Sequence, residues 1–236
     1  MQSGSLPYSG YAQASEHGRI RIYQWDCMEL LKQTPDNYYG LCIVDPPYGL
    51  PKSSIHGRGD LKGRALNLGS GKMSGWDTPP SAKYFTELFR VSKDQIIWGG
   101  NHFALPPCRG PIVWDKCQPW ENFAQVEIAW YSGEWPAQLF KLDNRAGGKI
   151  HPTQKPVALY RWLLQNYAKP GQKILDTHGG SMSIAIACDI EGFDLTLCEL
   201  DKDYFEAGKK RLEQHQAQPR LFEAAPSPSP IQTTIL

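Results

Sequence analysis

The chain has 236 residues, 41% of them hydrophobic, which is enough for one α/β domain with a full core. Its formal net charge of +1 excludes a general attraction to nucleic acid, so any such binding must depend on local basic patches. No apolar run reaches the length of a membrane span, the N-terminus lacks the regions of a signal peptide, and the six cysteines show no paired CxxC spacing. These features predict a cytoplasmic protein with reduced thiols and without a metal site.

The first regular element is predicted at residues 19–24, where apolar and polar side chains alternate as in a half-buried strand. The polar, Gly- and Ser-rich residues 1–18 before it are expected to be flexible. Asp26 and Cys27 follow the strand and precede a short predicted helix at residues 28–32. This strand and helix lead into the most informative segment of the chain.

The segment Leu41–Gly49 runs from four apolar residues into Asp45, Pro46, Pro47 and Tyr48. A short apolar run rich in β-branched residues predicts a strand buried on both faces, with Asp45 at its carboxyl end, where open α/β sheets bind ligands. Each proline fixes its own φ and donates no hydrogen bond, so the chain leaves the sheet as a stiff extended segment. A carboxylate and the Pro46 carbonyl can accept both hydrogens of an NH2 group while the tyrosine ring stacks on its plane. We therefore interpret this segment as a site for a flat molecule that carries an amino group.

Residues 49–78 form a glycine-rich, basic stretch beside this segment. Such a loop suits a phosphate backbone, although a solvated surface loop is the simpler alternative. A second basic stretch is predicted at residues 132–150. The candidate DNA contacts in the two stretches are Lys52, Arg58, Lys62, Arg64, Lys72, Lys141 and Arg145.

The middle of the chain is predicted to hold a helix at residues 80–91 and strands at 95–98, 111–114 and 124–130. The last two strands are close enough in sequence to be antiparallel neighbours. Farther along, the segment His151-Pro152-Thr153-Gln154-Lys155-Pro156 opens a predicted helix at 157–167. Thr153 and Lys155 at its start predict a carboxylate site, with a helix cap and a surface charge as the simpler alternative.

A predicted strand at 173–176 ends in Asp176 and continues through a turn with two glycines into a helix at 183–190. A strand, a glycine-rich turn and a helix in this order are typical of a site for a nucleotide-like cofactor. Glu199 ends the next predicted strand, at 194–198, and an acid in that position suits ribose hydroxyls. The turn alone is weak evidence for a cofactor site, but the turn together with Glu199 is considerably stronger evidence.

These motifs together resemble the amino-group DNA methyltransferases. Asp-Pro-Pro-Tyr at 45–48, His-Pro-Thr-Gln-Lys-Pro at 151–156 and the later glycine turn follow the order of their permuted beta class. The Asp-Thr-His form of the turn, with Ile-Ile-Trp-Gly-Gly-Asn and Ile-Val-Trp-Asp-Lys, is similar to small adenine methyltransferases of phages and prophages. The resemblance covers residues 19–213. It implies a three-layer Rossmann-like methyltransferase fold, whose seven-stranded mixed sheet includes one antiparallel hairpin.

The resemblance implies a methyl transfer from S-adenosylmethionine to the amine of an adenine in double-stranded DNA. The catalytic residues would be Asp45, Pro46, Pro47 and Tyr48. The cofactor positions would be Asp26, Cys27, Asp45, His151, Thr153, Lys155, Asp176, His178, Gly179, Gly180, Ser181 and Glu199. A cytosine-N4 enzyme and a nucleic-acid-binding relative that has lost the cofactor are the alternatives.

One residue departs from the family pattern, because Met182 stands where the usual turn has glycine. A positive φ at this position would strain a methionine by about 1–3 kcal/mol, and its side chain would crowd the cofactor. We expect either a shifted backbone, with Gly179 supplying the freedom, or weakened cofactor binding.

The tail at 214–236 is rich in Gln, Pro and Ser and is expected to be disordered. Gln218–Phe222 within it resembles the peptides by which bacterial replication proteins dock on the sliding clamp, although packing of Leu221 and Phe222 on the domain is the favoured explanation. The short segment between the motifs also suggests a homodimer in which a second subunit contributes to target recognition.

Overall fold

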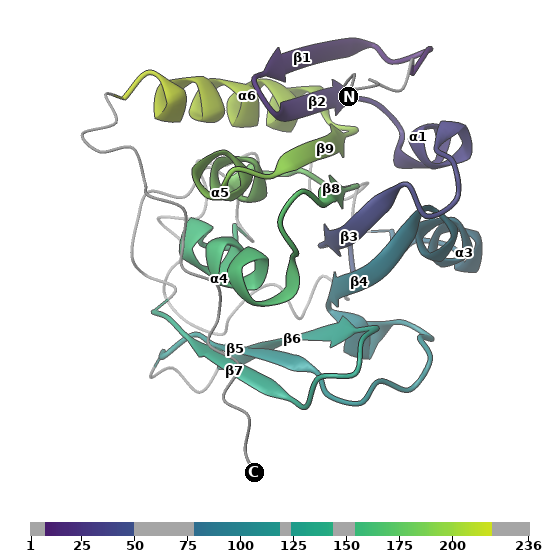
Figure 1. Ribbon diagram of the computed structural model, residues 1–236, viewed down its shortest axis with the longest axis vertical. Helices are drawn as coiled ribbons and strands as arrows, with labels where there is room; N and C mark the ends of the chain where they lie inside the picture. The colour runs from purple at the N-terminus through teal and green to yellow at the C-terminus, as the bar shows by residue number, and fades with distance from the viewer. Residues whose placement is uncertain (1–7, 50–77, 119–123, 144–153, 219–236) are drawn as a thin grey trace.

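The computed structural model describes residues 8–49, 78–118, 124–143 and 154–218. These residues contain one nine-stranded sheet with the order β1-β2-β9-β8-β3-β4-β6-β5-β7 (Figure 1). The strands are β1 (Gln13–His17), β2 (Ile20–Gln24), β3 (Tyr39–Val44), β4 (Ser92–Trp98), β5 (Ile112–Asp115), β6 (Val126–Tyr131), β7 (Gln138–Lys141), β8 (Lys173–Asp176) and β9 (Asp194–Glu199). The helices are α1 (Cys27–Gln33), α3 (Ala82–Val91), the 3-10 turn η3 (Gly100–His102), α4 (Val157–Tyr167), α5 (Ser183–Glu191) and α6 (Lys202–Gln216).

The centre of the sheet is parallel and its two ends are mixed. Strands β2, β9, β8, β3 and β4 pair in parallel, whereas β1 and β6 pair antiparallel with β2 and β4. Figure 1 shows α1 and α3 on one side of the central strands and α4, α5 and α6 on the other. The molecule is therefore a three-layer sandwich of helices around a sheet, the Rossmann-like arrangement predicted from the sequence.

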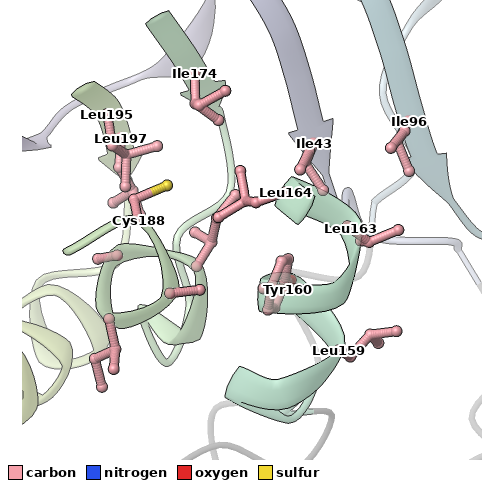
Figure 2. Packing of buried hydrophobic residues seen from close by; sticks show 14 of the residues in the cluster. Ile43, Ile96, Leu159, Tyr160, Leu163, Leu164, Ile174, Cys188, Leu195 and Leu197 are labelled. Atoms are coloured by element: carbon pink, nitrogen blue, oxygen red, sulfur yellow. The ribbon is translucent and has the colours of Figure 1, made fainter. Parts of the chain in front are cut away.

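Strand β3 is buried along its whole length, as its apolar sequence predicts. Leu41 and Ile43 on one face belong to the core that α4 and α5 cover (Figure 2). Cys42 and Val44 on the other face belong to a second core, which includes Leu30 of α1 and Leu88 of α3. Because both faces are packed, the position of Asp45 beyond the strand is fixed from two sides.

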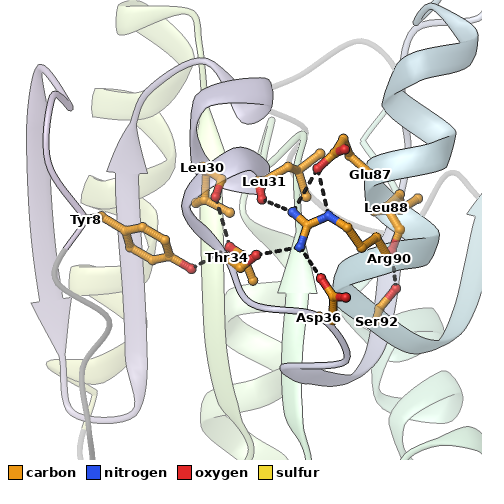
Figure 3. Close-up of polar contacts among 9 residues, drawn as sticks. All are labelled: Tyr8, Leu30, Leu31, Thr34, Asp36, Glu87, Leu88, Arg90 and Ser92. Atoms are coloured by element: carbon orange, nitrogen blue, oxygen red, sulfur yellow. Dashed lines mark hydrogen bonds and ion pairs between the residues drawn. The ribbon is translucent and has the colours of Figure 1, made fainter.

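Arg90 joins α3 to the segment that precedes β3 (Figure 3). Its guanidinium donates to the carbonyls of Leu31 and Thr34 at 2.8 Å each and to the carboxylate of Asp36 at 2.6 Å. Buried or half-buried carbonyls at a helix end need such donors. The contacts hold the loop between α1 and β3, and with it the start of β3, against α3.

The prediction of seven strands is wrong by two, because β1 and β7 were missed. β1 lies within the residues expected to be flexible, and it pairs antiparallel with β2 through a turn at Gly18 (φ +62°). β7 lies within the segment 132–150 and pairs in parallel with β5. Both are short edge strands whose side chains are largely exposed or half-buried, so neither leaves a strong apolar pattern in the sequence. The predicted antiparallel neighbours at 111–114 and 124–130 are confirmed as β5 and β6.

Helix α6 continues to Gln216, three residues past the predicted boundary at 213. Asp201 caps its start, accepting from the backbone N–H groups of Asp203 and Tyr204 at 2.8 and 3.1 Å. Its end is attached to α5 by Gln216, whose side-chain amide donates to Asp189 at 3.0 Å. The described residues include no helix with the length and apolarity needed to cross a bilayer.

Candidate active site

Four acidic residues lie at the carboxyl ends of four neighbouring parallel strands. Asp176 and Glu199 are the last residues of β8 and β9, Asp45 directly follows β3, and Asp26 comes two residues after β2. The chain leaves β8 through α5 toward β9 and leaves β3 through α3 toward β4, so the direction of winding reverses between β8 and β3. Open α/β sheets bind their ligands at such a reversal. The predicted amine site and the predicted cofactor turn thus lie at the same edge of adjacent strands.

The glycine turn is joined to Glu199 by backbone hydrogen bonds. The N–H of Gly180 donates to Glu199 Oε2 at 2.7 Å, and the N–H of Asp201 donates to Oε1 at 2.8 Å. Gly179 must be glycine, because a Cβ there would lie 2.3 Å from Leu197 Cδ2 of β9. These contacts fix the Glu199 carboxylate beside the turn, and each of its oxygens keeps a lone pair for a hydroxyl donor.

Met182 adopts the left-handed conformation itself, with φ +55°. The expectation of a backbone shift supplied by Gly179 is therefore wrong. The Met182 side chain is fully buried and packs against Gly208 of α6, while weakened cofactor binding stays a prediction. A Cβ at position 208 would lie 2.7 Å from Met182 Cγ, so the glycine in the middle of α6 makes room for the methionine.

Burial favours the uncharged forms of both Asp176 and His178. Burial raises the pKa of Asp176 to about 8, and the nearby Asp45 and Glu199 carboxylates add to this effect. Burial also lowers the pKa of His178 to about 4. The N–H of His178 donates to Asp176 Oδ1 at 3.0 Å. The turn consequently carries little charge of its own at neutral pH, apart from Glu199 beside it.

Tyr48 folds back onto Asp45. Its hydroxyl donates to Asp45 Oδ1 at 2.6 Å, and its ring stacks on His102 with centroids 5.0 Å apart and planes at 20°. Gly99 lies directly beneath the ring, since a Cβ there would come within 2.2 Å of Tyr48 Cε1. The Gly99-Gly100-Asn101-His102 segment after β4 is thus shaped to receive the Tyr48 ring.

Lys155 contacts Asp45 and is buried, so it is not a surface charge at the start of α4. Its side chain is 2% exposed. The ammonium forms ion pairs with Asp45 and with Glu127, where the Nζ–Oε2 distance is 3.1 Å, and it lies 5.1 Å from the centre of the Trp98 ring. It also donates to the Tyr48 hydroxyl at 3.4 Å.

Three residues of this region were missed by sequence reasoning: Lys116, Glu127 and His102. The alternating pattern of residues 124–130 places Glu127 on a polar face, which suggests exposure to solvent. In the structure Glu127 is paired with Lys155 and, at 2.5 Å, with Lys116, the residue that follows β5. The sequence signal that could have identified Glu127 is its charge, because it lies in a strand whose alternate residues are apolar.

The remaining predicted positions divide into described and undescribed ones. Asp26 caps α1, accepting from the N–H of Met28 at 2.8 Å, and Cys27 is the first residue of α1. Ser181 is buried, and its carbonyl accepts from Arg211 at 2.7 Å. Lys141 is exposed on β7. Outside the described residues lie His151, Thr153, Lys52, Arg58, Lys62, Arg64, Lys72, Arg145 and the Pro219–Phe222 part of the clamp-like segment.

Residues 113–210 match the protein family described as DNA methylase, under the family name for N6 and N4 enzymes. Over these residues the chain is similar to the DNA methylases. The match runs from β5 to α6 and includes Lys155, Asp176 and Glu199. YubD of Escherichia coli (strain K12) is named as a candidate methylase. It is 24% identical to this chain over 218 residues, which cover 81% of this chain and 89% of that protein.

The fold of this chain is similar to that of several solved structures. The M1.HpyAVI–SAM complex has a TM-score of 0.54 and 19% identity, covering 81% of this chain and 99% of that one. The cytosine-N4-specific PvuII DNA methyltransferase has a TM-score of 0.59 and 13% identity, covering 91% and 92%. At these identities the likeness concerns the fold.

Proposed function

We propose that the protein is a DNA methyltransferase that uses S-adenosylmethionine to methylate the N6 amine of adenine. The proposal rests on one observation above all: the Asp45–Tyr48 segment and the turn at 178–181 lie at the carboxyl ends of β3 and β8, which are neighbours in the sheet. An amine held by the Asp45–Tyr48 segment would therefore face a group held by the turn at 178–181. The match to the DNA methylase family supports this assignment.

The Asp45 segment suits an amine that is a poor nucleophile. The lone pair of an exocyclic base amine is delocalised into the ring, and hydrogen bonds from the amine to Asp45 and to the Pro46 carbonyl favour a tetrahedral nitrogen with a localised lone pair. Asp45 also stabilises the positive charge that grows on this nitrogen, and the proton lost from it leaves along the same hydrogen bond. No covalent intermediate with the protein is required.

The residues of the turn fit the cofactor. Gly179 lets the turn pack closely on β9, Glu199 would accept from ribose hydroxyls, and Asp26 at the carboxyl end of the strand beside β9 would lie near the adenine ring. Leu200, 69% exposed beside Glu199, offers an apolar side chain to that ring. When bound there, S-adenosylmethionine supplies an electrophilic sulfonium methyl group. Burial of the Met182 side chain against α6 supports cofactor binding over a relative that has lost it.

The target base has to leave the duplex, because its amine is paired there. Tyr48 supports this step, since its stacking on His102 shows that its ring can lie parallel to another flat ring. We assign the basic stretches at 49–78 and 132–150 to the DNA backbone. Lys141 on β7 is the member of this set that lies among the described residues, and it is exposed.

Cytosine-N4 methylation is the second candidate, because the amine chemistry is the same and the PvuII enzyme with the same fold is named as cytosine-N4-specific. Adenine is favoured by the resemblance of the Asp-Pro-Pro-Tyr segment and of the Asp-Thr-His turn to adenine methyltransferases. Digestion of methylated DNA to nucleosides separates N6-methyladenine from N4-methylcytosine.

The test compares the wild-type protein with Asp45→Asn, incubated with unmethylated duplex DNA and S-adenosylmethionine labelled in its methyl group. Asn keeps the volume of Asp45 but removes the charge, so we expect methyl transfer to fall by about 100-fold or more while calorimetric binding of S-adenosylmethionine is retained. A wild-type protein that binds the cofactor but labels no base would refute the proposed function. Substantial transfer by a folded Asp45→Asn protein would remove Asp45 from its role.

A further inference from the structure

Four charged side chains of alternating sign form a line that ends at Asp45. Lys116 contacts Glu127 at 2.5 Å, Glu127 contacts Lys155 at 3.1 Å, and Lys155 contacts Asp45. The four residues come from β6, from the ends of β5 and β3, and from the segment before α4. Segments far apart in the sequence therefore converge on one carboxylate.

The middle members of this line remain charged although they are buried. Burial opposes the charge on Lys155, but the carboxylates of Asp45 and Glu127 outweigh this effect and raise the pKa of its ammonium group. Burial alone would raise the pKa of Glu127, but Lys155 and Lys116 hold it below its ordinary value. Removing one partner would leave a buried charge unpaired, which is costly.

The Lys155 ammonium donates hydrogen bonds to the Asp45 carboxylate and to the Tyr48 hydroxyl, and it forms an ion pair with Glu127 at 3.1 Å. This arrangement leaves no donor directed to a cofactor carboxylate, the role that the sequence suggested for Lys155. A carboxylate has about four acceptor positions. Asp45 therefore keeps acceptor capacity for an amine while it is bound by Lys155 and Tyr48.

We propose that Lys155 and Glu127 are positioning residues, with Lys155 holding the Asp45 carboxylate oriented toward the target amine and Glu127 holding Lys155 and moderating its charge. This inference rests on the proposed function. Without Lys155, the Asp45 and Glu127 carboxylates would lie near each other without the cation that both contact. Without Glu127, Lys155 would act on Asp45 alone and weaken it as an acceptor.

Besides the carboxylates and the His102 imidazole that stacks on Tyr48, two phenols belong to this site. Tyr48 and Tyr160 of α4 both lie close to Asp45 and Lys155, and burial is the main reason that the pKa of each lies above its ordinary value. Both phenols therefore stay neutral near pH 7 and add no charge around Asp45.

The test is the pH dependence of single-turnover methyl transfer in Lys155→Met and Glu127→Gln. Loss of the cation leaves the carboxylates that Lys155 contacts without a positive partner, so Lys155→Met should move the acid limb of methyl transfer upward by about 1–2 pH units and recover part of its activity at high pH. Loss of the anion should move the acid limb of Glu127→Gln downward, with kcat lowered by about tenfold and S-adenosylmethionine binding unchanged. A purely structural role would lower activity in both variants without opposite shifts.

Lys32→Met is the matched control, since Lys32 forms an exposed pair with Glu29 on α1 and should retain the wild-type profile. If Lys155→Met is unstable, the double variant Lys155→Met, Glu127→Gln removes one charge of each sign. It should fold and show an acid limb between those of the single variants.

Two results would overturn the inference while leaving the proposed function intact. The first is a wild-type acid limb in a folded Lys155→Met protein. The second is a weakened affinity of Lys155→Met for S-adenosylmethionine with no shift of the profile, which would return Lys155 to the cofactor. A wild-type protein without methyl transfer would instead refute the proposed function itself.

Discussion

At the scale of single residues, the site is defined by what touches Asp45. Its two carboxylate oxygens are bound by the Tyr48 hydroxyl and the Lys155 ammonium. Tyr48 has two separable properties in this arrangement, since its hydroxyl donates to Asp45 and its ring stacks on a flat neighbour. Substitution can remove either property.

We expect Tyr48→Phe to lower kcat by less than about tenfold, because it removes one hydrogen bond to a carboxylate that keeps its other partners. Tyr48→Ala should lower kcat by about 100-fold, because stacking of a displaced base is worth about 1–3 kcal/mol and the alanine also loses the hydroxyl. The measurement is single-turnover methyl transfer with each variant. Equal losses would argue against stacking and in favour of the hydroxyl.

At the scale of elements, the start of α5 depends on α6. Met182 begins α5 in a left-handed conformation, and its side chain occupies the space that a Cβ at Gly208 would need. Backbone strain at Met182 is thus offset by burial of its side chain against the neighbouring helix. The two positions should be strongly coupled.

Met182→Gly should destabilise the protein by about 1–3 kcal/mol, because the loss of a buried methionine outweighs the relief of strain. Gly208→Ala should also destabilise the protein when Met182 is present, because its Cβ would meet Met182 Cγ. In the Met182→Gly background the same change should stabilise by up to about 1 kcal/mol, since alanine is the better helix former. Urea unfolding of the four proteins measures the coupling, and an equal effect of Gly208→Ala in both backgrounds would show that there is none.

At the scale of the whole molecule, the free energy of unfolding depends on pH because the pKa values of buried Asp176 and His178 differ between the folded and unfolded states. The folded protein holds a proton on Asp176 up to about pH 8, whereas the unfolded chain loses it near 3.8. His178 has the opposite effect, since it binds its proton near 6.5 in the unfolded chain and only near 4 in the folded one. The two effects nearly cancel between about pH 4 and 6.5, and above this range Asp176 acts alone.

We therefore expect the free energy of unfolding to fall by about 2 kcal/mol between pH 6.5 and 8, because the unfolded chain binds fewer protons than the folded one in this range. Asp176→Asn keeps the shape of the side chain and cannot ionise, so this decrease should disappear. Thermal unfolding of both proteins across the range provides the measurement. An unchanged decrease in Asp176→Asn would assign the dependence to another group.

The sequence by itself determined the buried strands, the order of the motifs and the residue types at the site, because these depend on local patterns: the apolar run before Asp45, the glycines after Asp176 and the acid at 199. It did not determine β1 and β7, since edge strands are held by backbone pairing that leaves no apolar alternation. Nor did it determine the surroundings of Lys155, which lies at a helix start in the chain but is buried among residues from β3, β4 and β6. Only the tertiary structure brings those residues together, because charges that are distant in sequence pair when the packed core excludes water from around them.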